Sequence, residues 1–242
     1  MLKALLLDLD ETLCDTTGAN NSALALMSKN AGDIFTGLDA DTFAQQYLQG
    51  IYRNFDEAQT QRYMPINDEA AFRQQLIQDL IAQQGHHCGP AAAQQLQRCF
   101  DDHRTECFDF FPGIKAKLAQ WRQRYTLVVI TNGPEFSQLT KVKAVNLTAH
   151  VDHIIIGGQE PEQKPAVSIF HKALSLADCC PHEALHVGDS LAADIKGAND
   201  SGIRSLWISH NQPNDGRIIP SHSVESPDQF IEFIDALTEC SP

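Results

Sequence analysis

The stretch ALLLDLDETLC, residues 4–14, joins a short apolar run to a group of acidic residues. The apolar run, residues 4–7, is typical of a strand that is buried on both faces of a parallel sheet. Asp8, Asp10 and Glu11 follow directly, and carboxylates at the edge of a core are costly to desolvate. The stretch therefore predicts a strand end where the protein must supply cations or make use of the charge.

Further apolar runs along the chain resemble this first one and alternate with segments of helical periodicity. The runs are TLVVIT at 126–131, HIIIGG at 153–158, EALHVGD at 183–189 and RSLWIS at 204–209. The helical segments lie near 135–147, 165–177, 192–200 and 227–239. Such alternation predicts a parallel sheet covered by helices on both faces, which is a Rossmann-like three-layer α/β/α core.

The region between the first two runs has a different pattern. Apolar residues recur there at spacings of three and four, with many Gln and Ala residues, over 19–31, 39–55, 68–84 and 90–108. The pattern predicts an all-helical domain, residues 15–109, that is inserted into an α/β core made of residues 1–14 and 110–242. Turn-forming residues are frequent at 209–226, which we therefore predict to be a surface loop.

Charge and composition limit the possible partners. The chain has 18 basic and 31 acidic residues and a net charge of -13, which argues against binding a nucleic acid polymer or an anionic membrane. No apolar run is long enough to span a bilayer, and the amino-terminal run is too short for a signal peptide, so we predict a cytoplasmic protein. The cysteines, an odd set of seven without regular spacing, are expected to be free thiols.

Polar residues gather at the carboxyl ends of the predicted strands, which is where open parallel sheets bind ligands. They are Asp8 and Asp10 after the first run, Thr131 and Asn132 at and after the end of 126–131, and Asp189 at the end of 183–189 with Asp194 five residues later. Lys164 directly precedes Pro165, a residue that can begin the next helix. By contrast, GHHC at 85–88 lacks a second Cys/His pair for zinc, and His171, His182 and His186 are interpreted as structural.

The motifs DLDET, TNG, KP and GDSLAAD occur in this order, each at its predicted strand end or helix start. This set resembles the four motifs of the haloacid dehalogenase superfamily. The resemblance covers the whole chain, because the helical insertion matches the first class of cap domain in that superfamily. Within it, DLDETL and GDSLAADIKGA are most similar to the group that holds N-acylneuraminate-9-phosphatase and pyrimidine nucleotidases.

The resemblance implies a role for each motif residue. Asp8 would be the nucleophile, and Asp10 would be the general acid for the leaving group and then the base for water. Asp8, Asp189 and the backbone carbonyl of Asp10 would ligate Mg²⁺, a cation that prefers oxygen ligands. Asp194 would not ligate the metal itself but would orient metal-bound water or Lys164.

Phosphate binding is expected from three further groups: the Thr131 hydroxyl, the Asn132 backbone N–H and the Lys164 ammonium. The implied function is Mg²⁺-dependent hydrolysis of a small phosphorylated metabolite, a sugar phosphate or a nucleotide monophosphate, through an aspartyl-phosphate. Arginines of the insertion are the candidate cations for a second anionic group of the substrate. They are Arg53, Arg62, Arg73, Arg98 and Arg104.

Few residues distinguish the phosphatases of this superfamily from its members that catalyse other reactions. Asp10 argues against a dehalogenase, because that branch needs no general acid at this position. The insertion contains only one lysine, Lys29, which disfavours phosphonate hydrolysis through a Schiff base. A phosphomutase, or a module that binds phospho-ligands without turnover, remains as an alternative.

Overall fold

The computed structural model describes residues 1–239, and the chain divides into two compact units. The α/β unit contains Met1–Thr16 together with the chain from Phe108 onward, and the helical unit contains Thr17–Cys107. Both crossings between the units lie two residues inside the insertion expected at 15–109.

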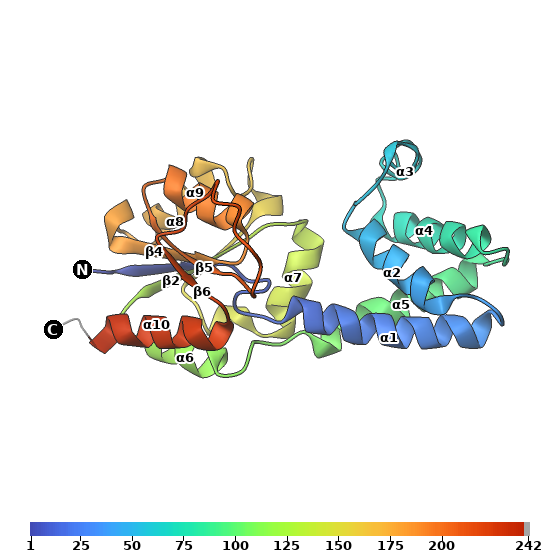
Figure 1. Cartoon of the computed structure of the whole chain (residues 1–242), viewed down its shortest axis with the longest axis horizontal. Coiled ribbons are helices and arrows are strands. Elements are labelled where there is room, and N and C mark those ends of the chain that lie inside the picture. Colours follow the sequence, from blue (N-terminus) through green and yellow to red (C-terminus); the bar gives the residue numbers. More distant parts are fainter. Residues whose placement is uncertain (240–242) are drawn as a thin grey trace. The chain divides into compact units, whose positions relative to one another are not determined.

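The α/β unit is built on a six-stranded parallel sheet in the order β3-β2-β1-β4-β5-β6 (Figure 1). The strands are β1 (Ala4–Leu7), β2 (Thr126–Thr131), β3 (His153–Ile156), β4 (Ala184–Gly188), β5 (Arg204–Ile208) and β6 (His222–Val224). β1 pairs with both β2 and β4, and all of its residues are buried, which explains why they are apolar. The predicted parallel sheet is therefore confirmed.

Helices cover both faces of this sheet (Figure 1). One face carries α8 (Val167–Leu176) and α9 (Lys196–Asp200), and the other carries α6 (Ile114–Trp121) and α10 (Pro227–Glu239). Phe170 of α8 belongs to a buried cluster with Leu6 and Val128 of the sheet. On the other side, the Trp121 and Phe230 rings pack with their centroids 5.2 Å apart. These contacts complete the three-layer α/β/α arrangement.

The helical unit folds around an apolar core of its own. Its helices are α1 (Thr16–Ile34), which begins at the last residue assigned to the α/β unit, α2 (Ala40–Ile51), α3 (Glu57–Tyr63), α4 (Glu69–Gln83) and α5 (Pro90–Cys107). The core includes Phe43, Tyr47, Phe72, Leu76 and Phe100, all with 1% exposure or less. These residues recur at helical spacings, so each helix presents one apolar face to the others.

Aspartates fix where three of these helices begin. Asp39, Asp56 and Asp68 each accept a hydrogen bond from a backbone N–H in the first turn of α2, α3 and α4, respectively. Side-chain acceptors of this kind satisfy N–H groups that have no partner within the helix. The sequence therefore encodes the helix starts as well as the apolar faces.

Two α-helices and one strand were absent from the sequence-based prediction: α3, α6 and β6. β6 has only three residues and lies within 209–226, which we had expected to be loop; its first two residues are exposed, so no apolar pattern marks it. α8 begins at Val167 rather than at Pro165. The Asn132 side chain binds both the N–H and the C=O of Lys164, which keeps that backbone out of the helix.

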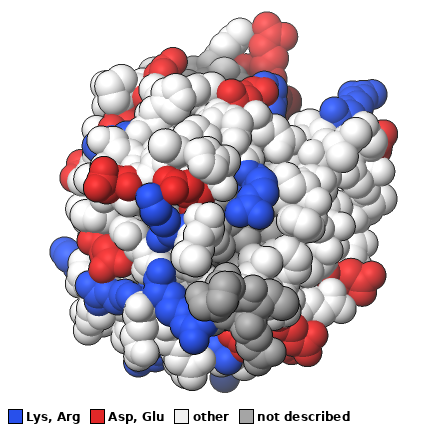
Figure 2. Space-filling view, turned by 90° about the vertical axis from the view of Figure 1, so that its left-hand side faces the viewer, with Lys and Arg blue, Asp and Glu red and all other residues white. Residues whose placement is uncertain are grey.

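The surface carries charges of both signs. Figure 2 shows one face, on which Lys and Arg side chains lie among Asp, Glu and uncharged residues. Such mixing fits a chain whose net charge of -13 does not favour polyanion binding. Among the helices of the described chain, none combines the length and apolar character that crossing a membrane requires.

Candidate active site

The motif residues meet because their strands are neighbours. Asp8 follows β1, Thr131 ends β2, and Asp189 follows β4, and these three strands are adjacent and parallel in the sheet. Their carboxyl ends therefore lie at one edge, the usual ligand-binding edge of such folds. The Asp8 backbone N–H extends the pairing by donating to the carbonyl of Val187, 2.9 Å away.

Lys164 lies between two carboxylates in this group. Its Nζ donates to Oδ1 of Asp8 at 2.6 Å and to Oδ1 of Asp194 at 2.7 Å. The three side chains are buried, with exposed fractions of 9% for Asp8, 2% for Lys164 and 1% for Asp194. Water is largely excluded here, so each charge depends on its protein neighbours.

Asp194 is held by several donors. It accepts from Lys164, from the Ser190 backbone N–H at 3.1 Å and from His186 Nε2 at 2.9 Å. The turn also requires Gly188, because a Cβ at that position would lie 2.3 Å from Cγ of Asp194. Glycine before Asp189 thus allows the approach of the Asp194 carboxylate, which gives a physical reason for the spacing of GDSLAAD.

Electrostatics distinguish the carboxylates of the group. Burial raises the pKa of Asp8 well above its usual range, although Lys164 acts in the opposite direction. Burial and the Asp194 carboxylate raise the pKa of Asp189 to about 7. Burial also opposes ionisation of Asp194, but Lys164 and His186 outweigh it and hold the pKa below its usual range. Asp8 and Asp189 therefore lack sufficient positive charge from protein groups.

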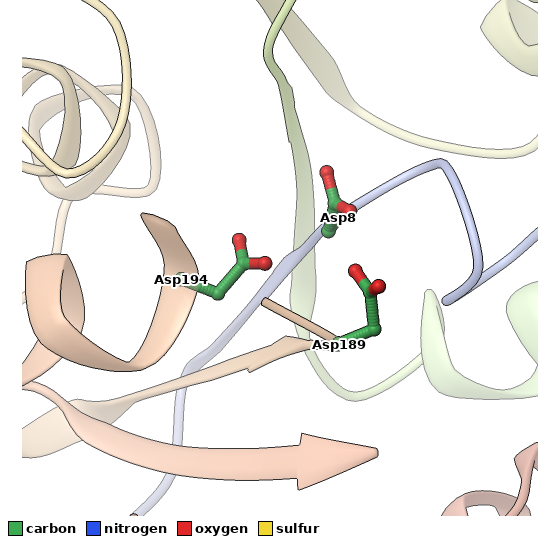
Figure 3. A group of neighbouring side chains, drawn as sticks. All are labelled: Asp8, Asp189 and Asp194. Carbon is green, nitrogen blue, oxygen red and sulfur yellow. The ribbon is translucent and has the colours of Figure 1, made fainter. Parts of the chain in front are cut away.

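The donor set fits a divalent cation. Oxygen atoms of Asp8, Asp189 and Asp194 all lie within 4.8 Å of one another, and the side chains point toward a common space (Figure 3). Three carboxylates face one ammonium, so full ionisation leaves two negative charges uncompensated. Hard oxygen ligands with such an excess charge suit Mg²⁺. Trp207 Nε1 donates to the Asp189 carbonyl at 2.7 Å and so holds one ligand in place.

Asp10 has a different set of partners. Lys141 Nζ donates to its Oδ1 at 2.6 Å, and the Thr16 hydroxyl donates to the same oxygen. Gln138 Nε2 lies 3.3 Å from Oδ2. Lys141 and Gln138 come from α7 (Glu135–Ala144), the helix that follows the TNG motif. The second acidic residue of DLDET is therefore compensated separately from the first.

The three residues predicted to bind phosphate lie close to this group. Thr131 is buried, and its hydroxyl makes only a weak contact of 3.5 Å with the Asn132 carbonyl. The Asn132 side chain holds the Lys164 backbone by two hydrogen bonds of 2.9 Å. The TNG and KP motifs are thus joined directly, and Lys164 is fixed relative to β2. Their role toward phosphate stays a prediction.

Several residues that contact the motif residues were not anticipated. His186, interpreted as structural, is fully buried in β4 and binds Asp194, a contact that was not predicted; its side chain points to the face that carries α8. Burial lowers the pKa of His186, and its Nε2 donates to the Asp194 carboxylate, which can only accept. Lys141 and Gln138 were also missed. Their spacing of three residues places them on one side of a helix, but a single sequence does not show that this side is buried.

Glu11 contributes to the site loop through its backbone. The residue is only partly exposed, and its φ of 55° lies in the left-handed region. Its carbonyl accepts a hydrogen bond of 2.6 Å from His210 Nε2. A contact of the backbone, which carries no sequence signature, thus links the loop after β1 to the loop after β5.

In the helical unit, three of the five candidate arginines pair with acidic residues. Arg53 binds Glu69, Arg62 binds Asp79, and Arg73 binds both Glu69 and Asp101. Arg104 instead donates to the Tyr52 hydroxyl at 3.2 Å. Within residues 1–239, no ion pair is found for Arg98 or Arg104, so these two remain the better candidates for binding an external anion.

Comparison with known proteins shows which family this chain matches. Residues 2–202 match the profile of the haloacid dehalogenase-like hydrolases. Human N-acylneuraminate-9-phosphatase is 25% identical over 239 residues, covering 96% of this chain and 91% of that protein. Phosphoserine phosphatase of Thermus thermophilus is 28% identical over 240 residues, covering 92% and 95%, respectively.

Solved structures agree on the fold. The hydrolase YfnB from Bacillus subtilis, in a crystal form bound to magnesium, superposes with a TM-score of 0.70 at 21% identity, covering 97% of this chain and 99% of that one. The family match extends over most of the sequence and includes every motif described above. The chain therefore belongs to the haloacid dehalogenase-like hydrolases.

Proposed function

We propose that the protein is a Mg²⁺-dependent phosphatase that hydrolyses a small phosphomonoester through an aspartyl-phosphate. The observation that carries the proposal is the group of Asp8, Asp189 and Asp194, in which Lys164 pairs with Asp8 and Asp194 and carboxylate charge is in excess. The Asp8 and Asp189 carboxylates and the Asp10 backbone carbonyl would hold the metal ion. When bound, Mg²⁺ would offset this charge and the charge of the transferring phosphoryl group.

Asp8 performs the first step. One of its carboxylate oxygens attacks phosphorus, an O–P bond forms, and the bond from phosphorus to the leaving oxygen breaks. Burial favours this step, because a poorly solvated carboxylate keeps no water shell that must first be removed. Lys164 donates to Asp8 Oδ1 and orients the carboxylate for attack.

Asp10 supplies and then removes the proton. Its carboxylic acid gives a proton to the leaving oxygen as the first P–O bond breaks, and the resulting carboxylate accepts a proton from the water that attacks the phosphoenzyme. The Asp8–phosphorus bond then breaks and releases inorganic phosphate. Thr131, the Asn132 backbone N–H and Lys164 donate to the phosphoryl oxygens in both steps.

The substrate class follows from charge and from relatives. An acidic surface does not suit polymeric polyanions, and the named relatives act on small phosphorylated metabolites: N-acylneuraminate 9-phosphate and phosphoserine. Both of those substrates carry a carboxylate besides the phosphate. We therefore expect a small phosphomonoester, with phosphorylated carboxylic acids as the first compounds to test.

Phosphate release over a panel of phosphorylated metabolites tests the proposal. The assay is run with Mg²⁺ and again with a chelator, and para-nitrophenyl phosphate serves as a general aryl substrate. Hydrolysis that needs Mg²⁺ and disappears in D8N supports the phosphatase. Binding of several panel members without phosphate release would instead support a module that binds phospho-ligands without turnover.

A further inference from the structure

The side chain of Asp10 is held by two residues of a single helix. Lys141 Nζ lies 2.6 Å from Oδ1, and Gln138 Nε2 lies 3.3 Å from Oδ2. The two residues are three positions apart on α7, so they project from the same side of the helix. Both oxygens of one carboxylate are thus contacted by one rigid element.

Lys141 is placed for a specific role rather than for solubility. Its side chain is only 10% exposed, and its ammonium also lies 5.7 Å from the centre of the Phe108 ring. Burying an ammonium is costly unless a partner compensates it, and the Asp10 carboxylate supplies that partner. On the same helix, Lys143 is exposed, as expected of an ordinary surface lysine.

Gln138 connects this pair to the TNG motif. Its Nε2 donates to the Asn132 carbonyl at 2.7 Å, in addition to its contact with Asp10. Gly133 leaves room for this approach, because a Cβ there would lie 2.8 Å from Gln138 Nε2 and displace that side chain. A displacement of α7 would therefore disturb Asp10 and the phosphate-binding loop together.

We propose that Lys141, assisted by Gln138, is the positioning residue that holds Asp10 in the orientation for proton transfer; this inference rests on the proposed function. Lys141 touches neither phosphorus nor the leaving group and acts through Asp10. When Asp10 gives its proton to the leaving oxygen, the carboxylate that forms meets an ammonium already in contact with it. The same contact then keeps the carboxylate aimed at the attacking water.

The kinetic test uses leaving groups of different basicity. K141M keeps the length of the apolar stem but removes the ammonium, K141R keeps the charge, and K143M is the matched control on the same helix. We expect K141M to lower single-turnover rates about 10–100-fold for an alkyl phosphate but less than about threefold for para-nitrophenyl phosphate, which needs little protonation. K141R should recover most of the alkyl rate. Equal losses on both substrates would overturn the proposal.

A structural test does not depend on turnover. Crystal structures of the wild type, K141M, K141R and K143M are compared at the Asp10 carboxylate, which should rotate in K141M alone. An unmoved Asp10 in K141M overturns the positioning role, even if the wild type hydrolyses nothing in the panel and the proposed function has failed. If K141M does not fold, Q138M takes its place, with a smaller loss on the alkyl substrate and a displaced Asp10 as the expected results.

Discussion

Each unit of the protein buries a cation among carboxylates, but the two clusters differ in charge balance. In the helical unit, Arg73 binds Glu69 at 2.7 Å and Asp101 at 2.6 Å, and Arg53 also binds Glu69. Two guanidinium groups therefore face two carboxylates. In the α/β unit, the candidate metal site has three carboxylates and one ammonium, that of Lys164, which pairs with Asp8 and Asp194.

The difference indicates what each cluster does. A balanced cluster pairs its own charges, so we expect it to hold helices together. An unbalanced and more deeply buried cluster stores unfavourable charge that a bound cation can relieve. Burial of charge alone would not have separated the two, because Arg73 is only 11% exposed. The excess of carboxylate is the property that distinguishes the candidate active site.

The largest expected effect comes from removing the nucleophile. D8N should reduce turnover to background and abolish any acid-labile phosphoenzyme, because the amide neither attacks phosphorus nor serves as an anionic metal ligand. D101N makes the same exchange in the balanced cluster and should leave turnover within about threefold of the wild type. Phosphate release and acid-quench trapping of the phosphoenzyme measure both. A phosphoenzyme in D8N would assign the nucleophile to another residue.

The second effect separates Asp10 from Asp8. D10N keeps the backbone carbonyl proposed to reach the metal and removes only proton transfer, a contribution of about 10²–10⁴-fold. Alkyl phosphates should therefore lose more than para-nitrophenyl phosphate, and Mg²⁺ affinity should persist. Single-turnover kinetics and calorimetric Mg²⁺ titration measure the two properties. Equal losses on both substrates, with chemistry rate-limiting, would remove Asp10 from the general-acid role.

The fold was predictable from the sequence wherever local pattern and tertiary environment agree. Both ends of the strand at 126–131 were predicted correctly, because a continuous apolar run bounded by polar residues indicates a buried strand of a parallel sheet. β6 was missed because its three residues are stabilised by pairing with β5 and not by burial. Sequence periodicity records burial, so an edge strand of this kind leaves no trace in it.

The sequence predicted the site residues that belong to recognisable motifs. It did not predict residues that reach the site only through the packing of a helix. Asp8 and Asp189 follow neighbouring strands, as expected, and Lys164 and Asp194, which the motifs placed near a helix start and five residues after Asp189, lie beside them. Lys141 was not foreseen, because it meets Asp10 across 131 residues of sequence and from the last turn of a helix, where lysine is common. A buried lysine and an exposed one, such as Lys143, look the same in a single sequence.

The pH dependence of the free energy of unfolding tests the excess of carboxylate charge in the candidate metal site. The pKa of Asp189 rises from 3.8 to about 7 on folding, so the folded state binds more protons than the unfolded state between these values. Without metal, Asp189 therefore lowers the free energy of unfolding as pH rises from about 4 to about 7. Mg²⁺ should then raise the melting temperature more at pH 8 than at pH 5, because protons compete for its ligand.

Calorimetric scans with Mg²⁺ and with a chelator, at both pH values, measure this effect. D189N should remove most of the Mg²⁺-dependent shift at pH 8, and D101N should retain it. A shift of equal size at pH 5 and pH 8 would contradict a metal site built on Asp189.

The smallest expected effect arises in the balanced cluster. R73M leaves Glu69 and Asp101 without their main cation, and a buried pair that loses one partner usually costs several kcal/mol. Here the acidic side chains are 27% and 35% exposed, so water compensates part of the loss and we expect a decrease of about 1–3 kcal/mol in the free energy of unfolding. R62M removes a more exposed pair, with Asp79, and should change stability little.

Denaturant titration compares the stability of the two variants. Calorimetry of R73M should give wild-type Mg²⁺ affinity, because neither Glu69 nor Asp101 belongs to the proposed metal site. Weakened Mg²⁺ binding with unchanged stability would mean that charge balance does not distinguish the structural cluster from the catalytic one.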